Sequence, residues 1–168
     1  MLASDEGRAP VEIERFALPP IARREILGDD ARPIPYGSRW GLGAPPEDAY
    51  GVASHKERYA PLRDVADALV AHVLATRACS VEERPLERGE LRALTLRAAA
   101  GAGGAPRLTA VRLAWTDFPG VTAELGRDVP DAAPICGCDA CDEDVVVVAE
   151  SFVDVVLRAV ADWPRRAS

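Results

Sequence analysis

Two stretches of the chain repeat their apolar residues at helical spacing, and this pattern limits the folds open to it. The first begins at Pro61 and places Leu62, Val65, Ala66, Leu69, Val70, Val73 and Leu74 on one face. The second follows Asp142 and places Val145, Val148, Ala149, Phe152, Val156, Ala159, Val160 and Trp163 on one face. Apolar residues at this spacing predict two amphipathic helices. Four consecutive valines leave a strand open as the start of the second.

Three segments between these helices have the pattern of strands. Residues 91–98, 108–115 and 121–125 alternate apolar with polar side chains, and an alanine- and glycine-rich loop at 99–106 joins the first two. Residues 80–89 and 126–134 are predicted to be turns or loops. We therefore predict an α+β fold, in which a three-stranded antiparallel sheet packs against two main helices.

The first 34 residues differ from the rest in composition. Acids, arginines and prolines follow one another there, and the prolines exclude a long helix. We predict an irregular N-terminal arm at 1–34, a single domain at 35–164 and a short tail at 165–168. The chain of 168 residues is long enough for one domain with a core of its own.

Charge and hydropathy exclude several classes of partner. The net charge of -7 opposes binding to nucleic acid and to anionic membranes. No apolar run approaches the roughly 20 residues of a membrane-spanning helix, and the first residues lack the apolar core of a secretory signal. We expect a cytoplasmic protein whose thiols stay reduced.

The most unusual stretch is residues 135–144, which holds three of the four cysteines and four acids. Cys136, Cys138 and Cys141 follow a C-x-C-x-x-C spacing, so that one turn can direct all three sulfurs to a single ion. Structural Zn²⁺ takes four nitrogen or sulfur ligands. The fourth would come from elsewhere in the chain, and the candidates are His55, which we expect first, and His72, Cys79 and Asp139.

Other interpretations of the cysteines remain open. They are equally compatible with small, half-buried residues in a tight loop. A redox couple of Cys138 with Cys141 is a further alternative, and a Cys141 nucleophile is the weakest because no matching base motif is present. The nearby acids favour a cation over a bare thiolate.

Glycines punctuate the loop at 36–46, which also carries aromatic residues. Trp40 either anchors this loop or lines a pocket. The second interpretation places a ligand pocket at Arg39, Trp40, His55 and Trp115, which would serve a small-molecule-binding protein or a small enzyme.

Several of these motifs together resemble a known family of actinobacterial proteins. The strings are Pro35 to Gly41, Pro46 to Tyr50, Ser54 to Leu62, Thr116 to Val121 and Cys136 to Glu143. They are similar to domain-of-unknown-function family 6226, from about Pro35 to the last helix. Where that family tends to have His-Pro-Glu-Arg-Phe, this chain has His55-Lys56-Glu57-Arg58-Tyr59. The resemblance implies no activity, and only that the cysteine string and the histidine loop belong to one recurring unit.

Taken together, these features predict a small cytoplasmic binding or interaction domain, without catalytic residues, that has a structural zinc site in its cysteine loop. Its partner would be an unidentified protein or small molecule. The alternative is the small-molecule binder or enzyme, with cysteines that are structural or redox-active.

Overall fold

The computed structural model describes residues 15–100, 104–126 and 129–167. In this part of the chain the elements follow one another as α1 (Pro61–Thr76), β1 (Cys79–Glu83), β2 (Glu90–Ala98), β3 (Ala110–Thr116), β4 (Gly120–Glu124), β5 (Asp131–Ala133) and α2 (Val145–Ala159). Two short 3-10 helices, η1 (Glu47–Ala49) and η2 (Lys56–Tyr59), precede α1. The predicted α+β class is confirmed.

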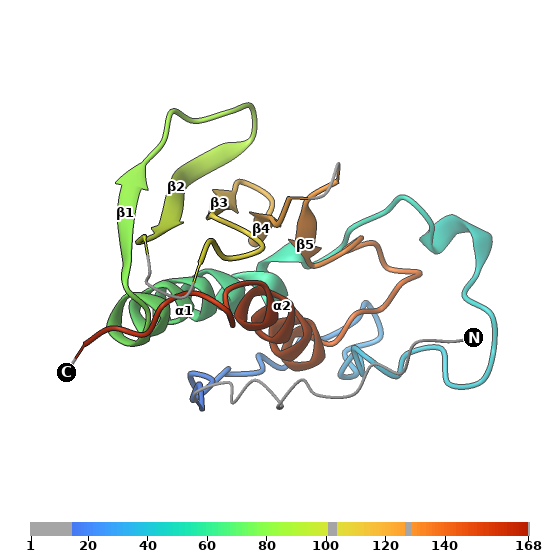
Figure 1. The fold of residues 1–168 in the computed structure, drawn as a ribbon. Coiled ribbons are helices and arrows are strands. Elements are labelled where there is room, and N and C mark those ends of the chain that lie inside the picture. The colour runs from blue at the N-terminus through green and yellow to red at the C-terminus, as the bar shows by residue number, and fades with distance from the viewer. Residues whose placement is uncertain (1–14, 101–103, 127–128, 168) are drawn as a thin grey trace, which may run out of the picture.

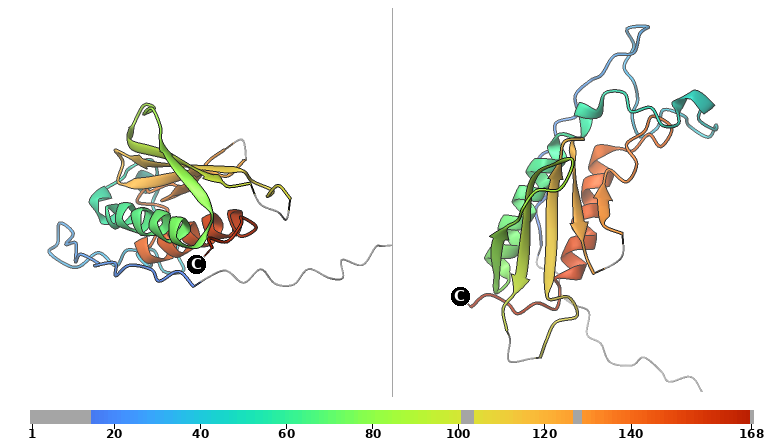
Figure 2. Two further views of the ribbon diagram at one scale, coloured as in Figure 1. Left: turned by 60° about the vertical axis from the view of Figure 1, so that its left-hand side comes forward. Right: turned by 90° about the horizontal axis from the view of Figure 1, so that it is seen from above.

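The strands form one antiparallel sheet in the order β1-β2-β3-β4-β5, so that each strand pairs with its neighbour in sequence. Leu94 pairs with Leu113 across β2 and β3, and Trp115 pairs with Val121 across β3 and β4. Both helices lie against one face of the sheet, and the described part of the N-terminal arm, residues 15–34, runs on the side of the helices away from the sheet (Figures 1 and 2).

The prediction of three strands was wrong, because β1 and β5 add an edge strand on each side. β1 shows no alternation of burial, and four of its five side chains are exposed. It is a strand because its backbone pairs with β2, from Cys79 opposite Ala98 to Glu83 opposite Leu94. β5 has only three residues and pairs with β4, with Ala133 opposite Val121. An edge strand is defined by backbone hydrogen bonds, which leave no periodic pattern in the sequence.

The apolar core lies between the sheet and the two helices. Leu69 and Val65 of α1, Phe152 and Val156 of α2, and Leu94, Leu113 and Val121 of the sheet are all at most 3% exposed. The helical stripes predicted from the sequence therefore form the core face of each helix. The strand alternative for 145–148 is wrong, since those residues are the first turn of α2.

Both helices begin at the same end of the molecule. Beyond their last turns, Arg77 forms a bridge with Arg165, and the Ala78 N–H donates to the Pro164 carbonyl. The opposite end, where α1 and α2 begin, carries the 36–60 segment and the loop between β5 and α2 (Figure 2). Neither described helix combines the length and the apolar content needed to cross a bilayer.

The arm is irregular where it is described. From residue 15 to 34 it has one isolated bridge, between Leu27 and Pro33. Phe16, Leu18 and Ile21 pack against the core, which attaches this segment to the helices. Residues 1–14 of the predicted arm, 101–103 of the predicted 99–106 loop and 127–128 of the predicted 126–134 loop lie outside the described residues. The division into arm, domain and tail stays a prediction.

Candidate metal centre

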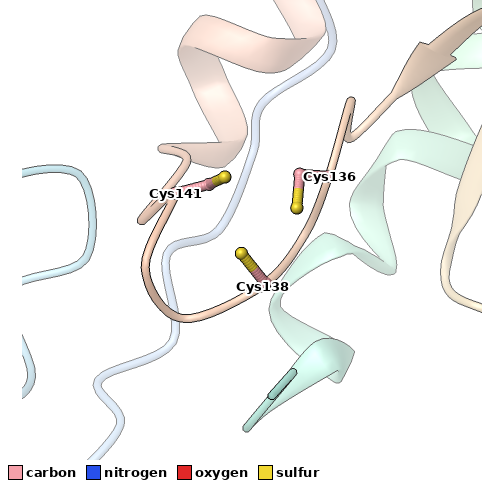
Figure 3. Close-up of side chains that lie close together, drawn as sticks. All are labelled: Cys136, Cys138 and Cys141. Carbon is pink, nitrogen blue, oxygen red and sulfur yellow. The ribbon is translucent and has the colours of Figure 1, made fainter. Parts of the chain in front are cut away.

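The three sulfur atoms of residues 135–144, which we call the cysteine loop, converge. The Sγ atoms of Cys136, Cys138 and Cys141 all lie within 4.8 Å of one another and point to a common centre (Figure 3). All three are free thiols. With Zn–S bonds of about 2.3 Å at tetrahedral angles, the sulfurs of a zinc site would stand about 3.8 Å apart. The sulfur–sulfur distances would need to shorten only slightly for the three atoms to bind one zinc ion.

The sulfurs differ in their access to solvent. Cys138 is buried, whereas Cys136 and Cys141 are exposed. An ion at this centre would therefore lie at the surface, with Cys138 beneath it.

Glu143 holds the first part of the loop. Its Oε1 accepts a hydrogen bond from the Ile135 N–H at 3.0 Å, and its Oε2 accepts from the N–H groups of Cys136 at 3.1 Å and Gly137 at 2.7 Å. These three donors would otherwise be unpaired in a tight turn. A single carboxylate thus fixes the backbone on which the first cysteine sits.

The three aspartates of the stretch also bind the protein's own groups. Asp139 Oδ1 accepts from the Ser54 N–H at 2.9 Å, and Asp142 Oδ2 accepts from the Arg39 N–H at 2.7 Å. Asp144 caps α2 by accepting from the N–H groups of Val146 and Val147. The acids that the sequence suggested as attractors for a cation therefore build the loop and join it to neighbouring segments.

Gly137 occupies a position that only glycine fits. Its φ is +75°, in the left-handed region. A Cβ there would lie 2.6 Å from Phe118 Cζ and 3.1 Å from Pro134 Cγ. The glycine between the first two cysteines allows the chain to turn closely over the ring of Phe118.

Trp40 covers the other side of the loop. Its indole N–H donates to the Asp139 carbonyl at 3.0 Å, and its ring packs on a small cluster of Ala49, Cys138 and Ala140. Two backbone bonds run alongside, from the Asp139 N–H to the Val52 carbonyl and from the Ala140 N–H to the Ala49 carbonyl. The cysteine loop and the 40–54 segment thus form one unit.

The thiols influence one another's proton affinity. Hydrogen bonds from the Cys136 side chain and from the Cys141 backbone lower the pKa of Cys138 to about 7. These hydrogen bonds therefore favour the thiolate form of Cys138. The pKa of Cys141 rises to about 12 because hydrogen bonds with the side chains of Cys136 and Cys138 favour its protonated form. Cys141 keeps its proton, which makes it a poor nucleophile.

The candidates for a fourth ligand do not join the cluster. In the described part of the chain, the metal-binding group consists of the three cysteines alone. The His55 ring lies 3.3 Å from Glu57 Oε1, His72 packs edge-on against Phe16, and the Cys79 Sγ lies near the Val73 carbonyl. Asp139 is next to the sulfurs in sequence, but its carboxylate is bound by Ser54 and lies 3.8 Å from the Arg39 guanidinium.

The four residues of the predicted pocket make their contacts in three places. The Arg39 guanidinium lies over the Trp40 ring, 4.6 Å from its centroid. Trp115 belongs to the main core, where its indole N–H donates to the Arg63 carbonyl and its ring lies under Arg92. His55 contacts Glu57 at the start of η2.

Sequence reasoning missed the part played by Glu143 and by Arg58. The Arg58 guanidinium is stacked between the Tyr36 and Tyr59 rings at 4.1 and 4.3 Å, and the Tyr59 hydroxyl donates to the Glu143 carbonyl. A signal for Glu143 was available, because a tight turn with three free N–H groups needs an acceptor close by in sequence. The signal for Arg58 was absent, since its partners come from distant segments.

The model of a protein family matches residues 22–165, which is most of the chain. The chain belongs to this family. It is the family of unknown function DUF6226, and the match confirms the resemblance seen in the motifs. Among curated proteins and among solved structures, nothing matches the chain. Membership in DUF6226 supplies no activity, so that the argument about function depends on the geometry of the site.

Proposed function

We propose that this DUF6226 protein is a small cytoplasmic binding or interaction domain, without catalytic activity of its own, whose cysteine loop holds a structural Zn²⁺ through Cys136, Cys138 and Cys141. The observation that carries the proposal is the convergence of the three sulfurs within 4.8 Å. Three thiols that only fill space in a tight loop need not face one centre at the protein surface.

The character of the donors favours zinc. Thiolates are soft ligands, which select Zn²⁺ and Cu(I) over Mg²⁺ and Ca²⁺. The loop's carboxylates are engaged by Ser54, by Arg39 and by backbone N–H groups, which leaves the sulfurs as the donors that face the centre. These bonds hold the loop's backbone in the shape that brings the three sulfurs together.

The fourth coordination position is open in this arrangement, with Cys136 and Cys141 exposed beside it. A donor from outside the described residues would complete the four ligands of a structural site. A binding role fits better than hydrolysis, because His55 and the loop's acids are engaged elsewhere and none is placed as a general base for a bound water.

Elemental analysis of the purified chain tests the proposal. We expect close to one equivalent of zinc per chain, lost in Cys138→Ser and retained in Cys79→Ser. Cys79 is the matched control because it is a free, half-buried thiol outside the cluster. Chelation of the wild-type protein should expose three further thiols to titration and lower its melting temperature. Less than about a tenth of an equivalent of metal, with stability unchanged by chelator, would rule out the site.

The sulfur separation also favours a second candidate, a redox couple of Cys138 and Cys141. The lowered pKa of Cys138 suits attack on an oxidised partner. This hypothesis predicts that mild oxidation of metal-free protein forms a disulfide between Cys138 and Cys141, which lowers the mass by two hydrogens. A thiol reductant should restore them. Sequestration of the thiols by zinc would prevent the same reaction.

A further inference from the structure

A cavity of about 670 Å³ lies between the N-terminal arm and the ends where both helices begin. We call it the arm cavity. Ile26, Ile34 and Tyr36 line it from the arm side, and Arg58, Pro61 and Arg63 line it from η2 and α1. Its volume falls within the range of about 300–1,000 Å³ that is usual for small-molecule sites. None of the four residues predicted from the sequence as a pocket belongs to this lining.

Three residues that line the arm cavity each have a buried polar atom without a hydrogen-bond partner among the described residues. The atoms are the Tyr36 hydroxyl oxygen, Arg58 Nε and Arg63 Nε. Buried polar groups in native proteins are nearly always paired. Three unpaired groups on residues that line one cavity therefore indicate a missing partner. Each group is able to donate a hydrogen bond, so that the partner should be an acceptor.

The two arginines are held in place by their other atoms. Arg58 is only 7% exposed. Its Nη atoms donate to the Ser54 and His55 carbonyls and to the Tyr59 hydroxyl. The Arg63 Nη2 donates to the Thr116 carbonyl. Because Nη1 and Nη2 of Arg58 and Nη2 of Arg63 are engaged by the protein, both guanidinium groups are held in position before any ligand arrives, and the Nε–H of each has no partner.

Charge at the cavity favours an anion. Glu143 and Asp144 also line it, but their carboxylates are bound by backbone N–H groups of the cysteine loop and of α2. Glu57 pairs with His55 and is half exposed, and Asp64 is exposed on α1. One buried guanidinium, that of Arg58, and one partly buried guanidinium, that of Arg63, thus belong to the cavity lining, and neither is paired with a carboxylate in the described structure.

The start of α1 also favours an anion in the cavity. Ala60 is its N-cap, and no side chain there accepts from the first N–H groups of the helix. The positive end of this 16-residue helix, at Ala60, Pro61 and Arg63, lines the arm cavity. The start of α2, by contrast, is capped by Asp144.

We propose that the arm cavity binds a small organic anion, whose carboxylate or phosphate accepts hydrogen bonds from Tyr36, Arg58 and Arg63. The apolar part of the ligand would lie against Ile26, Ile34 and Pro61. Burial raises the pKa of Tyr36, so that its hydroxyl stays protonated as a donor at neutral pH. The proposal is independent of the zinc site, since no cysteine lines the cavity.

Nitrogen-15 NMR on the full chain tests the proposal, because arginine Nε–H groups give their own resonances. The probes are phenyl phosphate and phenylacetate, each titrated to 10 mM, with benzyl alcohol as an uncharged probe of the same shape. We expect at least one of the two anions to shift the Nε–H resonances of Arg58 and Arg63, and benzyl alcohol to leave them unmoved. The anion that binds more tightly identifies phosphate or carboxylate as the natural group.

Tyr36→Phe provides the critical variant, because it removes one hydroxyl that has no partner in the protein. Its melting temperature should match the wild type, and the dissociation constant of the better anion should rise about tenfold, as expected for a lost hydrogen bond to a charged group. Tyr50→Phe is the matched control, since Tyr50 is 59% exposed and lies outside the cavity. Unmoved Nε–H resonances with both anions, equal shifts with benzyl alcohol, or unchanged affinity in folded Tyr36→Phe would each overturn the proposal.

Discussion

The Oε2 atom of Glu143 accepts a hydrogen bond of 2.7 Å from the backbone N–H of Gly137, six residues earlier in the cysteine loop. The same atom accepts from Cys136, and its companion oxygen accepts from Ile135. The carboxylate therefore determines where the first sulfur stands relative to the other two. The proposed zinc site would depend on this residue although it contributes no ligand.

Replacement of Glu143 by glutamine should loosen the loop. The amide keeps one acceptor but places an NH₂ group against backbone donors, so that at least one of the three bonds is lost. We expect the free energy of unfolding to fall by about 1–3 kcal/mol. Zinc affinity should fall roughly 10- to 100-fold, as is usual for groups that orient metal ligands. Urea unfolding and competition with a chromophoric chelator measure the two effects.

Glu150→Gln is the control for this variant, because Glu150 is exposed on α2 and well beyond the loop. It should change neither the free energy of unfolding nor the zinc affinity. If Glu143→Gln binds zinc as tightly as the wild type, the carboxylate does not organise the site.

Gly137→Ala should destabilise the protein through two separate effects. The left-handed φ of +75° costs about 1 kcal/mol for alanine. The Cβ contact of 2.6 Å with Phe118 adds about 1–3 kcal/mol of overpacking. Chemical denaturation should therefore show a loss of about 2–4 kcal/mol.

Gly51→Ala separates these effects. Gly51 has a similar φ of +72°, but a Cβ there would meet nothing within 4 Å. It should lose only about 1 kcal/mol. A double variant, Gly137→Ala with Phe118→Leu, should recover part of the difference. Equal losses at the two glycines would show that the contact with Phe118 is unimportant.

The fluorescence of Trp40 should change when zinc binds. It packs against Cys138 and donates to the Asp139 carbonyl, so that conversion of the thiols to metal ligands changes the electric field at the indole. Trp115 and Trp163 lie in the core, 4% and 2% exposed. Zinc titration should alter the tryptophan emission of the wild type and leave that of Trp40→Phe nearly constant. A full emission change in Trp40→Phe would place the metal elsewhere.

The ion pair of Glu90 with Arg112 should make stability depend on acid pH. Arg112 donates to both carboxylate oxygens at 2.8 and 2.7 Å, and these hydrogen bonds lower the pKa of Glu90. A carboxyl whose pKa is lower in the folded state stabilises the fold above its unfolded pKa, and this stabilisation is lost as pH falls through the folded pKa. Glu90→Gln should thus cost about 1–3 kcal/mol at pH 7, and the difference from wild type should vanish in strong acid.

Glu124→Gln is the matched control for the pH experiment. Glu124 also pairs with Arg112, at 3.1 Å, but its side chain is 49% exposed. An exposed pair contributes about 0–1 kcal/mol, so that the loss should be smaller at every pH. A Glu90→Gln deficit that persists unchanged in acid would mean that packing, and not charge, is responsible.

The apolar pattern of the sequence predicted both long helices and the three central strands, because each of these elements buries one face and the burial is periodic. It began the second helix directly after Asp142, whereas α2 begins at Val145 and Asp144 is its N-cap. Asp142 instead has a φ of +48° and binds the Arg39 N–H. Two aspartates in adjacent turns look alike in sequence, and only the backbone direction distinguishes them.

What the sequence by itself determined is local: the helical stripes, the alternating central strands and the three cysteines, whose spacing of two and three residues allows their sulfurs to meet within one turn. Only the tertiary structure decided the edge strands and the hydrogen bonds that Asp139 and Asp142 accept from Ser54 and Arg39. It also decided that Tyr36, Arg58 and Arg63 line one cavity. The physical reason is separation along the chain. A hydrogen bond such as that from Arg39 to Asp142 joins residues 103 positions apart, and no local pattern records which distant donor a carboxylate will find.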